Sequence, residues 1–245
     1  MTAPFPTHAQ EEWRYADLEA LKPVWEQFSD TATLIVGAGE SLEQVWLPTA
    51  DDVQLRRVRL GIGEGAKARI FALNNAPVYG RIELDVSLDK GADFALFGAN
   101  IGGGVSTNEF VTNVRHVGEA GRSRQVIRSV LNGKAVGSYL GKVEVARGAQ
   151  QTDGEQSVKA MLLNRGATAN CKPELEIYAD DVKCAHGASI GELDAMQLFY
   201  AESRGMDPAS ARALLLEGFV MGLWDRASEP DAICDTARAA LRRVV

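Results

Sequence analysis

The segment CAHGAS, in the last third of the chain, combines a thiol and an imidazole at a spacing that suits metal chemistry. Cys184 and His186 are two residues apart, and side chains with this spacing point to the same face of a β-strand. Thiolate sulfur and imidazole nitrogen are both ligands that iron accepts. The pair is equally compatible with a small buried cysteine beside a hydrogen-bonded histidine in a turn. Cys171 lies too far upstream for a compact ligand motif, and we expect it in the core.

Other catalytic chemistries find little support. The chain contains only three histidines, too few for a multi-histidine metal centre, and it lacks the G-x-S-x-G motif of a nucleophile elbow. The segment IVGAGES lacks the third glycine of a dinucleotide-binding loop. Carbohydrate cleavage requires aromatic platforms beside paired carboxylates, whereas the tryptophans lie outside the region of predicted strands. These four residues are Trp13, Trp25, Trp46 and Trp224.

Composition limits the class of protein further. The chain has 245 residues, of which 46% are hydrophobic, so it can bury one substantial core. Its net charge of -7 disfavours nucleic acid as the partner. No apolar stretch approaches the roughly 18 residues of a membrane span, and the first residues do not resemble a secretory signal. Three cysteines are too few for a disulfide framework. We therefore expect a cytoplasmic protein that binds neither nucleic acid nor membrane.

Short runs of alternating apolar residues, separated by glycine, occur from about Val53 to Ile190 and predict β-strands. The β core that we expect spans residues 31–192. Glycine followed by alanine recurs between these runs, at intervals of very roughly 20 to 30 residues, which is typical of repeat architectures. We expect an all-β core in which glycine occupies the corners of stacked parallel coils, although a β-sandwich would also alternate strands with turns. The predicted corners are Gly65, Gly91, Gly148, Gly166 and Gly187.

Helical patterns flank this core. Residues 1–30 predict a short helical docking segment, broken by Pro23 and anchored by apolar side chains. These anchors are Trp13, Leu18, Leu21 and Trp25.

Residues 193–245 predict a C-terminal α-helical region. One helix ends at Gly205, and Asp207 with Pro208 begins another that continues to about Trp224. Apolar residues cover two adjacent faces of this second helix, a stripe wide enough to bind a partner. The candidate binding residues in the stripe are Leu215, Phe219, Leu223 and Trp224.

The sequence YADDVKCAHGASIGELDAMQLFYAESRGMDPASARALLLEGF, from Tyr178 to Phe219, closely resembles the C-terminal signature of the SufB/SufD family of iron–sulfur cluster assembly scaffolds. The segment EEWRYADLEAL, from Glu11 to Leu21, is similar to the family's N-terminal Glu-x-Trp-Arg-Tyr motif and favours the SufD branch. The chain looks shorter than many members, as if much of the N-terminal helical region were lost. The resemblance covers most of the chain.

The resemblance implies a right-handed parallel β-helix, a SufB-like paralogue as partner and a SufC ABC-type ATPase docked on the C-terminal helices, at Leu215, Phe219, Leu223 and Trp224. It places His186, with Cys184 beside it, at the interface with the paralogue, where a transient iron–sulfur cluster would be held. No cofactor is expected to stay bound, and no reaction is expected of this chain, since ATP hydrolysis belongs to SufC. The isolated chain is expected to form a homodimer.

Two alternatives remain open at this level. One is a carbohydrate-active β-helix enzyme, and the other is a purely structural homodimeric β-helix protein.

Overall fold

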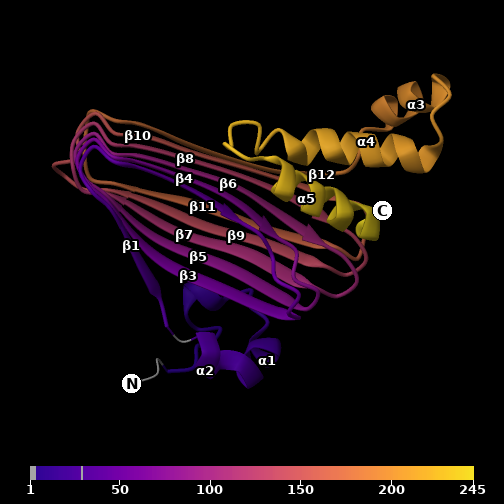
Figure 1. Cartoon of the computed structure of the whole chain (residues 1–245), viewed down its shortest axis with the longest axis horizontal. Coiled ribbons are helices and arrows are strands. Elements are labelled where there is room, and N and C mark those ends of the chain that lie inside the picture. Colours follow the sequence, from indigo (N-terminus) through magenta and orange to yellow (C-terminus); the bar gives the residue numbers. More distant parts are fainter. Residues whose placement is uncertain (1–3, 29) are drawn as a thin grey trace.

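The computed structural model, which describes residues 4–28 and 30–245, is a parallel β-helix with helices on its outer faces (Figure 1). Each coil contributes one strand to each of two sheets. Sheet A has the strand order β1-β3-β5-β7-β9-β11, and sheet B has the order β12-β10-β8-β6-β4-β2. Every pair of neighbouring strands is parallel. The predicted parallel β-helix is therefore confirmed, and the sandwich is wrong.

The strands of sheet A are β1 (Ala32–Val36), β3 (Val53–Ile62), β5 (Tyr79–Leu88), β7 (Thr107–His116), β9 (Val136–Val145) and β11 (Thr168–Ile177). Those of sheet B are β2 (Ser41–Trp46), β4 (Lys67–Asn74), β6 (Asp93–Gly102), β8 (Arg122–Leu131), β10 (Asp153–Leu162) and β12 (Lys183–Gly191). Val53 pairs with Tyr79, so a coil takes 26 residues here, whereas Val136 pairs with Thr168, so that a later coil takes 32.

The interior of the coils is a column of apolar side chains contributed by both sheets. Leu60, Leu84, Phe94, Leu96 and Phe110 are fully buried within it. Alternate residues of each strand point inward, and helices cover parts of the outer faces, which explains why many strands are apolar on both sides.

Glycine permits the tight corners in two of the predicted positions. Gly65 and Gly91 have φ angles of +65° and +64°, a region that costs other residues a steric penalty, and Gly65 N–H donates to the Lys90 carbonyl at 2.8 Å. Gly187 differs from the prediction, because it lies inside β12 rather than at a corner. His186 and Gly187 are thus part of a strand.

The N-terminal segment packs on the outer face of sheet A, beneath β3 in Figure 1. Its pieces are η1 (Glu11–Trp13), α1 (Leu18–Leu21), η2 (Lys22–Val24) and α2 (Trp25–Phe28). Trp13, Leu21 and Trp25 are buried and Leu18 is partly buried, as predicted for anchors. Residues 1–3 and 29 of the predicted 1–30 segment lie outside the described residues.

A buried arginine fastens this segment to the sheet. The Arg81 guanidinium lies 3.7 Å from the centre of the Trp13 ring and donates to the Glu12 carbonyl at 2.8 Å. It also pairs with Glu109 at 2.9 Å, and both side chains are completely buried. Arg81 therefore joins two coils of sheet A to the N-terminal helices.

Three helices follow β12, namely α3 (Ala195–Ser203), α4 (Pro208–Met221) and α5 (Asp231–Val244). Asp207 caps α4 by accepting from the backbone N–H groups of Ala209 and Ser210, and Gly205 has a φ of +90°, as the sequence predicted. In Figure 1, α4 and α5 lie along sheet B, whereas α3 projects beyond it. Among the described residues, no helix is long and apolar enough to cross a membrane.

Candidate functional site

The site predicted from CAHGAS lies at one end of the β-helix, on its final strand. β12 pairs with β10 on one side, and β11 pairs with β9 on one side. Within the described chain, no strand pairs with the other side of either. Their outer backbone groups thus remain available for pairing with another chain. We call this end, formed by β11 and β12, the open end.

The register shows where Cys184 and His186 point. Cys184 pairs with Gly154, and His186 pairs with Gln156, which is 1% exposed and hydrogen-bonded inside the coils. Paired residues of parallel strands face the same way, so Cys184 and His186 both continue inward-facing rows. Cys184 is half-buried, whereas His186 is exposed because no further coil covers it.

The Cys184 thiol at the open end loses its proton less readily than the thiol of a free cysteine. Burial is the main reason that the pKa of Cys184 is raised; a hydrogen bond with the Gly154 backbone opposes the shift, and the nearby Asp153 carboxylate adds to it. Gly154 leaves room for the sulfur, since a Cβ at that position would lie 3.3 Å from Cys184 Sγ. Cys171, on β11, is also partly buried against the core, and burial raises its pKa. A soft metal would have to displace the Cys184 proton on binding.

One thiol and one imidazole can supply two ligands, whereas a protein-bound iron–sulfur cluster is typically held by four. Among the described residues, no group of three or more His, Cys, Asp or Glu side chains could hold a metal ion. The geometry therefore fits part of a shared site at an accessible edge. The sequence predicted correctly that the two side chains are neighbours on one face of a strand. It did not predict that they are the last members of inward-facing rows of the β-helix.

Beneath His186 lies a layer of buried polar side chains that sequence reasoning missed. Gln156 Nε2 donates to Tyr139 Oη at 2.9 Å, and Tyr139 Oη donates to Gln125 Oε1 at 3.1 Å. Thr112 Oγ1 is 3.3 Å from the same hydroxyl. Burial raises the pKa of Tyr139 to about 12, so the hydroxyl stays neutral. Polar residues at inward positions of strands, in RQVIRS and EQSV, were the available signal.

The helix predicted to continue to about Trp224 ends at Met221, and the partner-binding stripe predicted along it divides into two parts. Leu223 and Trp224 are 6% and 0% exposed and pack against sheet B, and Trp224 Nε1 donates to the Phe97 carbonyl at 3.3 Å. The prediction that these two side chains are available to a partner is therefore wrong. Leu215 and Phe219 are half-buried. The stripe is wide because part of it covers the β-helix.

The apolar surface that remains exposed lies between α3 and α4, away from the sheet. Met196, Phe199, Tyr200 and Leu214 are 73%, 66%, 59% and 53% exposed. Leu215 and Met206 join Met196, Tyr200 and Leu214 around a shallow hollow of about 730 Å³. We call these exposed residues, with the hollow, the α3–α4 surface. Apolar groups gathered in this way typically mark a binding surface.

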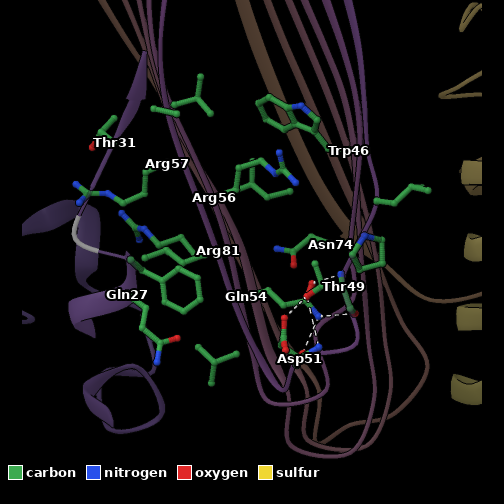
Figure 2. A pocket seen from close by; sticks show the side chains of 18 of the residues that line it. Gln27, Thr31, Trp46, Thr49, Asp51, Gln54, Arg56, Arg57, Asn74 and Arg81 are labelled. Atoms are coloured by element: carbon green, nitrogen blue, oxygen red, sulfur yellow. Dashed lines mark hydrogen bonds between the residues drawn. The ribbon is translucent and has the colours of Figure 1, made fainter. Parts of the chain in front are cut away.

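A second hollow, of about 470 Å³, lies where β1 and β2 leave the first coil incomplete (Figure 2). Arg56 extends toward Trp46, with its guanidinium 5.0 Å from the ring centre, while Arg57 and Arg81 lie nearer the N-terminal helices. Trp46 is 3% exposed and belongs to β2, so it lies within the first coil rather than outside the strands. Buried beneath Arg56, it offers no platform for a sugar ring.

Comparison with known proteins decides the family. Residues 30–219 match the family model described as "SUF system FeS cluster assembly, SufBD core domain". The chain belongs to the SufBD core family. The match covers all the described strands together with α3 and most of α4, so it includes both the open end and the α3–α4 surface.

Individual relatives agree with this family assignment. The iron-sulfur cluster assembly protein SufD of Escherichia coli is 39% identical over 101 residues, or 41% of this chain. Protein ABCI7, chloroplastic, of Arabidopsis thaliana is 46% identical over 102 residues, or 40% of this chain. The SufBD family protein slr0076 of Synechocystis is 29% identical over 181 residues, or 73% of this chain. The matched regions span 24%, 21% and 40% of these relatives.

Proposed function

We propose that this SufBD family member is a SufD-like scaffold subunit of an iron–sulfur cluster assembly complex. In this role its open end pairs with a SufB-like paralogue, and its C-terminal helices dock a SufC-type ABC ATPase. The chain itself carries out no reaction, and ATP hydrolysis belongs to the ATPase. Its three free cysteines suit a reducing compartment such as the cytoplasm.

The observation that carries the proposal is the thiol and imidazole side by side on an unpaired edge. A partner that adds its own strands to β11 and β12 would also bring its own side chains over Cys184 and His186. The nascent cluster is cargo, and it would be bound between the two subunits by ligands from both. This arrangement allows release, because separation of the subunits removes part of the ligand set.

The test compares cluster assembly by complexes that contain wild-type chain or the His186→Ala variant. The ring of His186 is exposed and makes no hydrogen bond to the described residues, so we expect normal folding, normal assembly with the paralogue and the ATPase, and a cluster yield reduced at least several-fold. Visible absorption and Mössbauer spectra measure the yield. His8→Ala is the matched control, because His8 lies on the N-terminal segment and should leave the yield unchanged. Full yield with His186→Ala would remove this residue from the mechanism.

The α3–α4 surface is the docking site that we propose for the ATPase. It replaces the predicted stripe, because Leu223 and Trp224 pack against sheet B. Leu215 remains a candidate binding residue, because it lines the hollow. Phe219 is partly covered by Arg128, whose guanidinium lies 5.8 Å from the ring centre. The partner would cover Met196, Phe199, Tyr200 and Leu214, each of which is more than half exposed.

A further inference from the structure

The hydrogen bonds in the polar layer beneath the open end have a fixed order of donors and acceptors. A tyrosine hydroxyl has one hydrogen, and Tyr139 donates it to Gln125 Oε1 at 3.1 Å. Toward Gln156 the same hydroxyl therefore acts as acceptor, and Gln156 Nε2 donates to it at 2.9 Å. This bond fixes the amide of Gln156, because its nitrogen must face Tyr139. The amide oxygen is turned away from the hydroxyl.

Gln156 Oε1 is a buried acceptor with no hydrogen-bond partner among the described residues. A buried acceptor without a donor is rare in proteins, because its desolvation is not compensated. The side chain of Gln156 is 1% exposed, so a partner must come from the rows on either side of it. Gln125 lies on one side, in register on β8, and its Nε2 is also buried without a partner among the described residues. His186 lies on the other side, in register on β12.

His186 is suited to be that donor. Neighbouring strands lie about 4.8 Å apart, and the inward-facing side chains of Gln156 and His186 start from directly paired residues. The ring makes no hydrogen bond to the described residues, so it is free to turn about its side-chain torsions. A neutral imidazole carries one N–H and one lone pair on different nitrogens, and donating the first fixes the direction of the second.

We propose that Gln156 is a positioning residue for His186. Gln156 Oε1 accepts a hydrogen bond from the ring nitrogen that faces it, which holds the imidazole in one tautomer and presents the other nitrogen, unprotonated, at the open end. Metal-binding histidines commonly have their second nitrogen oriented in this way. The consequence for cluster binding rests on the function proposed above for His186. The hydrogen bond itself does not depend on that function.

The hydrogen bond is tested on the isolated chain, without any cluster. With ¹⁵N-labelled histidine, long-range ¹H–¹⁵N spectra report the tautomer of each ring at a pH where the imidazole is neutral. The chain has only three histidines, and the His186→Ala variant identifies the His186 signals. We expect one dominant tautomer of His186 in the wild type. Gln156→Met removes the acceptor at similar side-chain volume, so in this variant we expect both tautomers to be populated. His116, buried elsewhere in the core, is the internal control.

The proposal would be overturned if Gln156→Met left the tautomer of His186 unchanged in a chain whose His116 signals and unfolding midpoint match the wild type. Tyr139→Phe provides a second test, because it releases the Gln156 amide without removing it, and we expect a smaller change in the same direction. If the tautomer responds but His186→Ala leaves the cluster yield intact, the hydrogen bond is supported and the cluster function is refuted. Cluster yield should fall less in Gln156→Met than in His186→Ala.

Discussion

At the scale of single residues, the chain contains two imidazoles in opposite situations. His186 lies exposed on the last strand, whereas His116 is completely buried at the end of β7. His116 Nε2 is 2.8 Å from Ser123 Oγ, and its Nδ1 has no partner among the described residues. Burial lowers the pKa of His116 to about 4, although Asp153 opposes the shift. Protonation of this ring is therefore coupled to the stability of the β-helix.

We predict that His116 makes the chain less stable in mild acid. The folded chain binds the proton only near pH 4, whereas the unfolded chain binds it near pH 6.5, so the unfolded state takes up more protons between these values. The free energy of unfolding should fall by roughly 3 kcal/mol as the pH drops through this window, and the loss should be complete below it. Urea unfolding measured at several pH values checks this slope.

His116→Gln should remove most of the slope, because glutamine does not titrate, even if it lowers stability at every pH. His186→Gln should keep the slope, since it leaves the buried ring of His116 in place. An equal slope in His116→Gln and the wild type would contradict the assignment.

At the scale of elements, the sequence predicted the types of structure well and the packing of one helix poorly. Alternating apolar residues identified the strands, because a period of two has few other interpretations. Asp207 and Gly205 marked the start of α4 and the end of α3, because their caps depend on local chemistry. The face of α4 that meets sheet B was not predictable, since Leu214, Leu215 and Leu216 place leucine on several sides.

The candidate site shows the same division between local and long-range information. Spacing alone placed Cys184 and His186 on one face of a strand. That Gly187 lies within the strand, that His186 follows Gln156 in register and that no coil covers it all depend on pairings between residues about 30 apart. Such pairings leave no local signal in the sequence.

Leu216 and Leu214 on α4 should have opposite effects on stability and binding. Leu216 is fully buried against sheet B, so Leu216→Ala should lower the free energy of unfolding by about 2 to 5 kcal/mol. Leu214 is 53% exposed, so Leu214→Ala should change it by less than about 0.5 kcal/mol. Denaturant unfolding measures both effects.

Leu214→Asp should leave folding intact and weaken binding of the ATPase by about tenfold or more, because a charge would be desolvated at the interface. Titration calorimetry with the purified ATPase measures the affinity. Unchanged affinity for Leu214→Asp would place the docking site elsewhere on the chain.

At the scale of the whole molecule, helices cover parts of the two sheets of the β-helix, whereas the open end is left uncovered. The N-terminal helices cover part of sheet A, and α4 and α5 cover part of sheet B (Figure 1). At the open end, by contrast, β12 is exposed along most of its length. Edge strands without protection tend to pair with other strands, and a surface shaped for a homologous partner can often pair with its own copy about a two-fold axis. The open end is thus the surface from which association is expected.

We predict that the isolated chain forms a homodimer through the open end. Ala188 pairs with Val158, a core residue, and continues its inward-facing row at this end, where it is exposed. Ala188→Lys should weaken the dimer by about tenfold or more, because pairing would bury the ammonium group. Val105→Lys is the matched control, since Val105 is 76% exposed in the turn between β6 and β7 and should leave the dimer unchanged. Sedimentation velocity over a range of concentrations measures both. A dimer that survives Ala188→Lys but not Val105→Lys would place the contact at the turns, and the open end would then lose its role in homodimer formation.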